Sequence, residues 1–553
     1  MVAAAYPARH TGTGLWFNPW TVAAVALTAV FLAPIIAVFV AAAGDSDGLW
    51  PHLLDTVIPR YVANTVILMT GVGGVSLLFG VTAAWLVTRF EFPFCRTFEW
   101  LLLLPATVPA YLIAYTYTDF LEYAGPVQGL LRDLFGWKSA RDYWFPEIRS
   151  MQGAMLVMGA VLYPYVYMMA RTAFLLTPKS LFETGRLAGR SIFWGVGLPL
   201  ARPAIAAGLA LVLMETISDF GTVEYFAIET LTLGIFNVWL GMNNLTAAAQ
   251  IASFAFLFII ALLVFELTAR SSRRYADTSR KAVSLEAGKL RGWRAAACVA
   301  ACATPVVLGF VVPVGVLLNF ILRGYSLDLD ESVVAAALNS VVLASVVAAL
   351  VMGAAAFMVL ASIHHGNVVL RRLTALASVG YAFPGTILAI GVVTAGGFID
   401  DRIAAVMGTL FGLSHVGLMT GGIGLVVFAC VVRFQAVGYG AITSGYERLS
   451  PNMMSASRTL GCGFGDSLRR VVLPLMRLSI VAGGLLVFVD VMKELPMTLL
   501  LRPFNYETLA TYVYQFAKDE LLEEAALPAL VIVLTGIIPV VFMNAALRRL
   551  IRR

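Results

Sequence analysis

Twelve long apolar stretches constrain this chain more than any other feature of its sequence. A helix needs about 20 predominantly apolar residues to cross a bilayer, and six such stretches precede residue 270 while six follow residue 294. The chain is 60% hydrophobic and 13% charged, whereas soluble domains are roughly 45–50% apolar and about 25% charged. The sequence therefore predicts an all-α, polytopic membrane protein with about 12 transmembrane helices. They are expected near 21–43, 62–88, 98–118, 151–170, 203–223, 248–269, 295–320, 335–362, 373–397, 416–437, 478–499 and 525–547.

The basic residues indicate how the chain is oriented in the membrane. Most of the 38 Lys and Arg fall in segments that share a side with the N-terminus, and most of the acids fall on the opposite side. Lys and Arg are enriched in cytoplasmic loops, so we expect a multi-pass protein with both termini in the cytoplasm. We expect membrane lipid as a partner and no nucleic acid, because the basic cytoplasmic loops account for the net charge of +6.

The second half of the chain repeats the first at one constant offset, which is the separation between Asn64 and Asn339. Six spans return a chain to its starting side, so both halves would insert in the same direction, around an axis along the membrane normal. We expect two parallel six-helix repeats at 1–270 and 295–553, joined by a cytoplasmic linker at 271–294, with a pore between them. The other pairs matched at this offset are Pro109 and Pro384, Leu198-Pro199 and Leu473-Pro474, Glu215 and Asp490, and Asp219 and Glu494.

One polar segment occurs in both halves, each time between the fourth and fifth spans. The first copy is Glu183-Thr-Gly-Arg-Leu-Ala-Gly189, followed by Leu198-Pro199, and the second is Ser455-Ala-Ser-Arg-Thr-Leu-Gly461, followed by Leu473-Pro474. A short helix on the cytoplasmic surface can insert into a cleft of a partner protein. The glycine after it permits a sharp bend, and the proline favours the start of the next helix.

These two copies resemble the EAA loop of binding-protein-dependent ABC importers, through which a permease holds its ATPase. The second copy lacks the leading glutamate, and the first has a shorter spacing between its glycine and its proline. The chain has no Gly-x-x-x-x-Gly-Lys-Ser/Thr phosphate loop. We therefore expect a permease that is not an enzyme and binds no cofactor, with ATP used by a separate ATPase dimer. The resemblance implies ATPase-docking roles for Glu183, Gly185, Ala188, Gly189, Pro199, Ser455, Ala456, Gly461 and Pro474.

Five ionisable residues at membrane depth are candidates for the translocation pathway. Glu215 and Asp219 are spaced i, i+4 in the fifth span, and Asp490 and Glu494 have the same spacing in the eleventh, so each pair is expected on one helix face. Such residues cost about 2.5–3.5 kcal/mol each at the membrane centre and are functional candidates by default. Carboxylates suit hard cations, and Lys493 could neutralise one acid or hold an anion. No tight metal site is predicted, and the alternative is that the acids lie solvated at the outer mouth or clamp helix ends.

The eleventh span carries a more specific resemblance. The segment Asp490-Val-Met-Lys-Glu-Leu-Pro-Met-Thr-Leu-Leu-Leu-Arg-Pro503, followed by Glu507-Thr-Leu-Ala-Thr-Tyr-Val-Tyr514, resembles permeases of ferric-iron ABC importers of the fused two-half type. Glu215-Thr-Ile-Ser-Asp-Phe-Gly221 fits the same group. This resemblance implies a type I importer permease fold in the bacterial inner membrane, with a periplasmic substrate-binding protein and a cytoplasmic ATPase dimer as partners.

Two kinds of alternative stay open. The Lys-Glu-Leu-Pro segment also occurs in importers of thiamine and of aminoethylphosphonate, so the same machinery could carry either substrate. An ion-coupled secondary transporter is the alternative from another class. It would work alone and would use the buried acids as proton sites.

Overall fold

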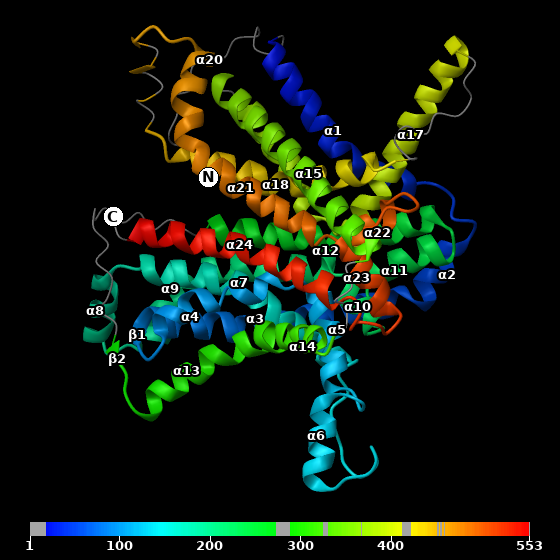
Figure 1. Ribbon diagram of the computed structural model, residues 1–553. Helices are drawn as coiled ribbons and strands as arrows, with labels where there is room; N and C mark the ends of the chain where they lie inside the picture. Colours follow the sequence, from blue (N-terminus) through cyan, green and yellow to red (C-terminus); the bar gives the residue numbers. More distant parts are fainter. Residues whose placement is uncertain are drawn as a thin grey trace.

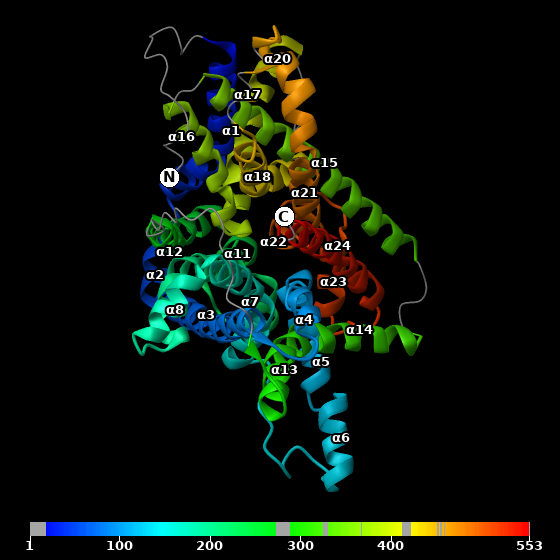
Figure 2. The same cartoon turned by 90° about the vertical axis from the view of Figure 1, so that its left-hand side faces the viewer.

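The computed structural model of the chain describes residues 18–271, 288–324, 330–365, 368–411, 422–450, 453, 456–457 and 459–551. In this part of the chain, nine helices are long and apolar enough to cross a membrane, and there are up to 11 if each of two bent helix pairs is one span. The twelfth predicted stretch falls on helix α24 (Ala526–Ile551), in which Ala526–Val541 is the apolar part. Figures 1 and 2 show an assembly built from helices, which confirms the prediction of an all-α polytopic membrane protein.

The helices follow one another with short connections. In the first half they are α1 (Pro19–Ala42), α2 (Leu49–Thr56), α3 (Ile58–Arg89), α4 (Cys95–Leu101), α5 (Ala110–Leu121), α6 (Pro126–Phe135), α7 (Met151–Leu176), α8 (Lys179–Leu187), α9 (Leu198–Ser218), α10 (Gly221–Tyr225), α11 (Leu231–Phe236) and α12 (Leu245–Ser271). In the second half they are α13 (Trp293–Val306), α14 (Val312–Leu322), α15 (Glu331–His365), α16 (Val368–Leu376), α17 (Gly385–Phe411), α18 (Gly424–Glu447), α20 (Phe464–Ser467), α21 (Leu473–Met492), α22 (Pro496–Leu501), α23 (Leu509–Lys518) and α24. Strands β1 (Phe90–Glu91) and β2 (Gly288–Lys289) pair in parallel between the end of α3 and the start of α13.

Two spans are broken at equivalent prolines. The helix Cys95–Thr107 meets Ala110–Phe135 at 93°, and Val369–Ala382 meets Gly385–Ala405 at 118°. Pro109 and Pro384, which are matched in the sequence repeat, stand directly before α5 and α17 in these bends. A proline disfavours helical backbone in the residue before it, and the preceding Val108 and Phe383 both have extended conformations, with ψ of 123° and 132°.

The sequence repeat is also a repeat of tertiary hydrogen bonds. Asn64 Nδ2 in α3 donates to the backbone carbonyl of Glu229 at 3.0 Å, and Asn339 Nδ2 in α15 donates to that of Glu507, also at 3.0 Å. These two asparagines are the pair that defines the offset of the repeat. Each bond fixes the second span of a half to the loop before a short helix, α11 or α23.

The two halves exchange their first spans. Helix α1 packs on α15, α16 and α17 of the second half as well as on α12 of its own half, whereas α13 and α14 pack on α3 and α5 of the first half. The Tyr117 hydroxyl in α5 donates to the backbone carbonyl of Leu308 at 2.9 Å, which joins the halves at this contact. The predicted division at 1–270 and 295–553 stays a prediction, and most of the predicted linker, 272–287, lies outside the described residues.

The exchange depends on close backbone approach at Gly391 of α17. A Cβ atom at Gly391 would lie 2.0 Å from the carbonyl oxygen of Pro34 in α1. We therefore expect Gly391→Val to destabilise the protein by about 1–3 kcal/mol, the usual cost of overpacking. Gly397→Val in the same helix is the matched control, because nothing lies within 4 Å of its Cβ position. Thermal unfolding of both variants in detergent measures the difference, and equal midpoints would contradict the contact.

The spans form two arms that separate toward one side of the molecule. In Figure 1, α9 and α24 belong to one arm and α15 and α21 to the other, and the arms meet near α22 and α23. Helix α8 lies at the far end of the first arm and α20 at the far end of the second (Figures 1 and 2). Helix α8 of the first polar segment and helix α20, which directly follows the second, therefore lie on the same side, away from the junction of the arms.

Candidate functional site

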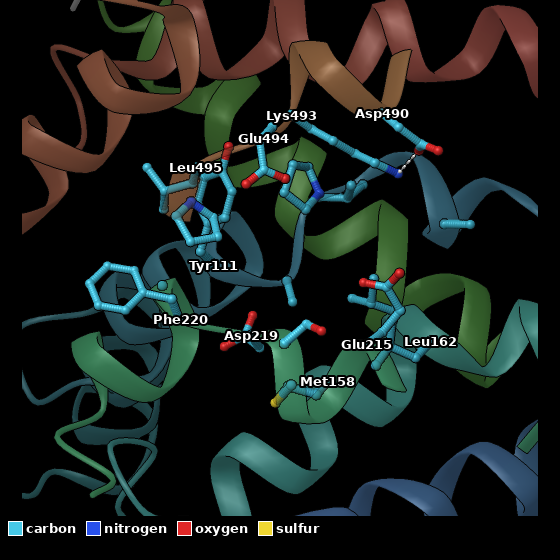
Figure 3. Close-up of a pocket in the computed structure, with 18 of the residues that line it drawn as sticks. Tyr111, Met158, Leu162, Glu215, Asp219, Phe220, Asp490, Lys493, Glu494 and Leu495 are labelled. Atoms are coloured by element: carbon cyan, nitrogen blue, oxygen red, sulfur yellow. Dashed lines mark ion pairs between the residues drawn. The ribbon is translucent and has the colours of Figure 1, made fainter. Parts of the chain in front are cut away.

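A cavity of about 850 Å³, counting the part open to solvent, lies where the two halves meet. Helices α5, α7 and α9 line it from the first half, and α18, α21 and α22 from the second. Figure 3 shows Glu215 and Asp219 on one side of the cavity and Asp490, Lys493 and Glu494 on the other. The structure therefore brings all five predicted pathway residues to one cavity, while their role in translocation stays a prediction.

Asp219 and Glu494 do not lie on the helices predicted for them. Helix α9 ends at Ser218 and α21 ends at Met492, so both acids lie in breaks of the helical backbone. The expectation that each acid pair shares one face of a continuous helix is therefore wrong. The apolar run continues past each break, so hydropathy alone does not reveal it.

The physical reason for the breaks is capping by the acids themselves. Asp219 Oδ1 accepts hydrogen bonds from the N–H groups of Thr222 (3.0 Å) and Val223 (3.2 Å), at the start of α10. Glu494 Oε1 accepts one from the N–H of Met497 (3.0 Å), at the start of α22. A side chain that satisfies free N–H groups at a helix start competes with continuation of the preceding helix. Clamping of helix ends, one of the two alternatives raised by the sequence, is thus observed for these two acids.

In the second half, each cavity acid has a basic partner. Glu494 Oε2 lies 3.3 Å from Arg433 Nη1, and the two side chains are only 5% and 7% exposed. Asp490 Oδ1 lies 3.0 Å from Lys493 Nζ, the pair marked in Figure 3. Buried charges are tolerated when they are paired and hydrogen-bonded, so these two pairs are internally neutral.

In the first half, the corresponding basic residues are missing. At the offset of the repeat, Ser218 stands in place of Lys493 and Met158 in place of Arg433. Asp219 is held by backbone N–H groups, and Glu215 accepts a hydrogen bond from the Tyr381 hydroxyl of the second half at 2.7 Å. The cavity lining therefore has four carboxylates and two cations, an excess of two negative charges when all are ionised.

Sequence reasoning missed two residues of this site, Arg433 and Tyr381. Arg433 is a basic residue inside the predicted span 416–437, and the rule that selected the four acids and the lysine also applies to it. Tyr381 gives no such signal, because a tyrosine in an apolar segment is as compatible with a core position as with a hydrogen bond to a carboxylate. Its role follows only from the approach of the two halves.

The two polar segments form matching turns. Helix α8 is followed by Ala188 at its C-cap, and the next residue, Gly189, has a positive φ of +68°; in the second copy Gly461 has a φ of +84°. Hydrogen bonds at both sites have the same spacing, from Arg190 N–H to the Gly185 carbonyl (2.9 Å) and from Cys462 N–H to the Ser457 carbonyl (3.1 Å). Glycine is favoured at such a helix end because it adopts positive φ without steric cost.

The remaining candidate docking residues differ in their surroundings. Glu183 is exposed and lies 3.6 Å from Lys179, whereas Gly185 is buried, so that a Cβ there would lie 2.4 Å from Val196. Ala188 and Ala456 are exposed, and Ser455 lies outside the described residues.

Pro199 and Pro474 lie in the first turns of α9 and α21, as expected, but a π-helical turn precedes each of these helices. The span that contains Pro199 already begins at Ile192 with a π-helical turn, and the span that contains Pro474 begins at Gly465, with a similar turn at Leu468–Val472. The helical backbone thus begins several residues before each proline, and the proline lies in the first turn of α9 or α21.

Spanning helices around a charged cavity shared by two repeats define a membrane transport protein. No family model matches the chain. It is 23% identical over 493 residues to the Fe(3+)-transport system permease protein FbpB 2 of Haemophilus influenzae, covering 87% of this chain and 89% of that protein. It is 22% identical over 518 residues to the ferric transport system permease protein FbpB of Actinobacillus pleuropneumoniae, covering 88% and 72%. It is also 30% identical over 225 residues to the sulfate transport system permease protein CysW of Escherichia coli, covering 40% and 73%.

The chain belongs to the family of ABC importer permeases, which confirms the resemblance seen in its sequence.

Proposed function

We propose that this chain is the membrane permease of an ATP-driven importer of ferric iron. Iron would be delivered by a periplasmic binding protein, and ATP would be hydrolysed by a separate cytoplasmic ATPase dimer. Alignment with ferric transport permeases over most of the chain supports this substrate. The same family includes sulfate and molybdenum transport permeases, so the substrate has to be argued from the cavity.

The excess of carboxylates in the cavity is the observation that carries the proposal. Oxygen ligands and negative charge suit a hard cation, while the two cations of the cavity are already engaged by Asp490 and Glu494. An oxyanion would meet Glu215 and Asp219 with no free positive group near them among the described lining residues. The charge balance therefore favours a cationic cargo over sulfate, molybdate or a phosphonate.

The cavity has the character of a passage. In the described residues, no group of three or more His, Cys, Asp or Glu side chains is placed to hold a metal ion. Carboxylates separated across a cavity can attract a cation without binding it tightly, and release is as necessary for transport as entry. Tight binding would be the task of the delivering protein outside.

The arms supply a route from ATP to the cavity. Helix α8 and helix α20, which follows Gly461 in the chain, lie at the separated ends of the two arms (Figure 1). Closure of an ATPase dimer that holds both segments would draw these ends together. The junction of the arms, where the cavity lies, would then open on the opposite side, and hydrolysis would return the arms to the arrangement seen here.

The substrate and the energy source are tested together in proteoliposomes. The permease is reconstituted with its ATPase, and uptake of radioactive ferric iron, thiamine and aminoethylphosphonate is measured, each presented on its binding protein. We expect iron uptake that requires both ATP and the ATPase. Uptake of another substrate instead would reject the iron assignment, and uptake by the permease alone, driven by an ion gradient, would reject the ABC mechanism.

We expect Gly461→Val to weaken association with the ATPase about tenfold. A β-branched residue at a φ of +84° costs roughly 1–2 kcal/mol or more in backbone strain, so the docking turn would change its conformation. Gly463→Val is the matched control, because Gly463 has no positive φ and open space around its Cβ position. Co-purification of the tagged permease with its ATPase is the measurement; equal recovery from both variants would contradict the docking assignment.

We also propose a bacterial inner-membrane location with both termini in the cytoplasm. The distribution of basic residues supports it. Reporter fusions at residues 1 and 553 that are active only in the cytoplasm would test the orientation.

A further inference from the structure

A buried arginine lies at the end of the second span, directly beneath the docking helix α8. Arg89 is the last residue of α3 and is only 7% exposed. Its Nη2 donates to the backbone carbonyl of Phe174 in α7 at 3.0 Å, while its Nε has no partner within the described residues. Burying a guanidinium without a carboxylate is costly, so its position calls for an explanation.

The explanation is its contact with α8. The guanidinium carbon of Arg89 lies 3.8 Å from the ring centre of Phe182, the fully buried aromatic residue of that helix. It also lies 5.5 Å from the ring of Trp85, one turn earlier in α3. Cation–π contacts of this kind are strongest when they are removed from water. One side chain therefore joins α8 to the ends of α3 and α7.

Aromatic rings complete this junction. Trp85 packs edge-on against Phe174 of α7 at 5.1 Å and against Phe193, in the turn before α9, at 5.0 Å. The backbone of Gly197 lies so close to Trp85 that a Cβ there would be 2.6 Å from the indole ring. Helices α3, α7 and α8 and the start of α9 thus meet around Arg89 and Trp85. Interiors packed in this way transmit displacement and do not absorb it.

The second half is built differently at the same place. At the offset of the repeat, Leu360 and Leu468 stand in place of Trp85 and Phe193, and they belong to an aliphatic cluster with Val472 and Met476. The second docking segment is held locally, by a hydrogen bond between the hydroxyls of Ser457 and Ser467 at 2.7 Å. The two docking segments are alike in their turns but differ in how they are attached to the spans.

We infer that Arg89 is a positioning residue that makes the first docking segment the principal point through which ATPase movement reaches the spans. This inference rests on the proposed function, in which α8 docks on the ATPase. A movement of α8 is passed to α3 and α7 through the Arg89 guanidinium and its aromatic neighbours. At the second site, movement is passed through leucine and methionine side chains, which readjust more easily.

The test separates assembly from coupling. Arg89→Met replaces the aliphatic stem of the arginine with an unbranched apolar side chain and removes the donor and the charge. We expect ATPase co-purification within about twofold of the unchanged protein, while cargo transported per ATP hydrolysed falls about tenfold, the equivalent of roughly 1.4 kcal/mol. Arg89→Lys, which keeps the cation, is expected to retain more of the coupling than Arg89→Met.

Arg171→Met is the matched control. The Arg171 side chain, in the same half, is only 11% exposed, but it pairs with Glu99 at 3.0 Å, whereas the cation–π contact to Phe182 of α8 is made by Arg89. Unchanged coupling in Arg89→Met, or an equal loss in Arg171→Met, would overturn the inference. If the ATPase fails to co-purify even with the unchanged permease, the proposed docking itself fails, which is a separate outcome.

Discussion

Arg433→Met is expected to destabilise the protein by about 3–5 kcal/mol, because it would leave Glu494 buried without a partner cation. The two side chains are 7% and 5% exposed, and their closest charged atoms are 3.3 Å apart. Breaking a buried pair from one side costs far more than the pair itself contributes. Unfolding of the purified permease in detergent, followed by heat or denaturant, measures the effect.

The double variant Arg433→Met/Glu494→Gln tests whether the unpaired charge of Glu494 causes the loss of stability. Removing the second charge should recover most of the lost stability, since no uncompensated ion then remains. Arg60→Met is the control, because the Arg60–Glu229 pair is exposed (57% and 40%) and exposed pairs contribute about 0–1 kcal/mol. A loss in Arg433→Met no larger than that in Arg60→Met would show that the buried pair has no such importance.

Glu215→Lys is expected to lower iron uptake about 100-fold, while the ATPase still co-purifies with the permease. The substitution changes the cavity from two excess negative charges to none, and charges near 4 Å interact by roughly 4 kcal/mol at an effective dielectric constant of about 20. Glu215 is the cavity carboxylate whose hydrogen-bond donor is a neutral phenol, that of Tyr381. Its charge is therefore the most available to a passing cation.

Glu215→Asp is the control for this second expectation, because it keeps the charge while shortening the side chain. Uptake of radioactive iron in proteoliposomes, with ATPase recovery measured on the same preparation, compares the variants. Full iron uptake by Glu215→Lys would show that the charge of the cavity does not determine which substrate is transported. Loss of the ATPase as well would indicate a folding defect and not a defect in the pathway.

Hydropathy and charge predicted the spans and the cavity acids because both signals are local. Each predicted apolar stretch falls on a long helix, a bent helix pair or α24, and Glu215 and Asp490 lie on the helices expected for them. The end of α9 at Ser218 was not predictable in this way. Asp219 lies inside an apolar run, and its hydrogen bonds to the first N–H groups of α10 form only in the folded chain, so hydropathy does not report them.

The exchange of first spans and the burial of Arg89 could not be predicted from the sequence either, because both depend on contacts between distant segments. The apolar pattern of α1 specifies a buried helix but not which helices cover it. Arg89 directly follows a predicted span, and a basic residue at such a position is normally solvated. Its burial follows from Phe182 and Trp85, which are far apart in sequence, so no short motif reports it.

The exchange of first spans also determines when the contacts of α1 can form during synthesis. Pro34 of α1 meets Gly391 of α17, a residue that is made more than half a chain later. At about 5–20 residues per second, the ribosome needs roughly 20–70 s to reach it. Helix α1 can thus pack on α12 of its own half early, but its neighbours in the second half are made only later, so a chain stalled in its latter half leaves one face of that helix uncovered.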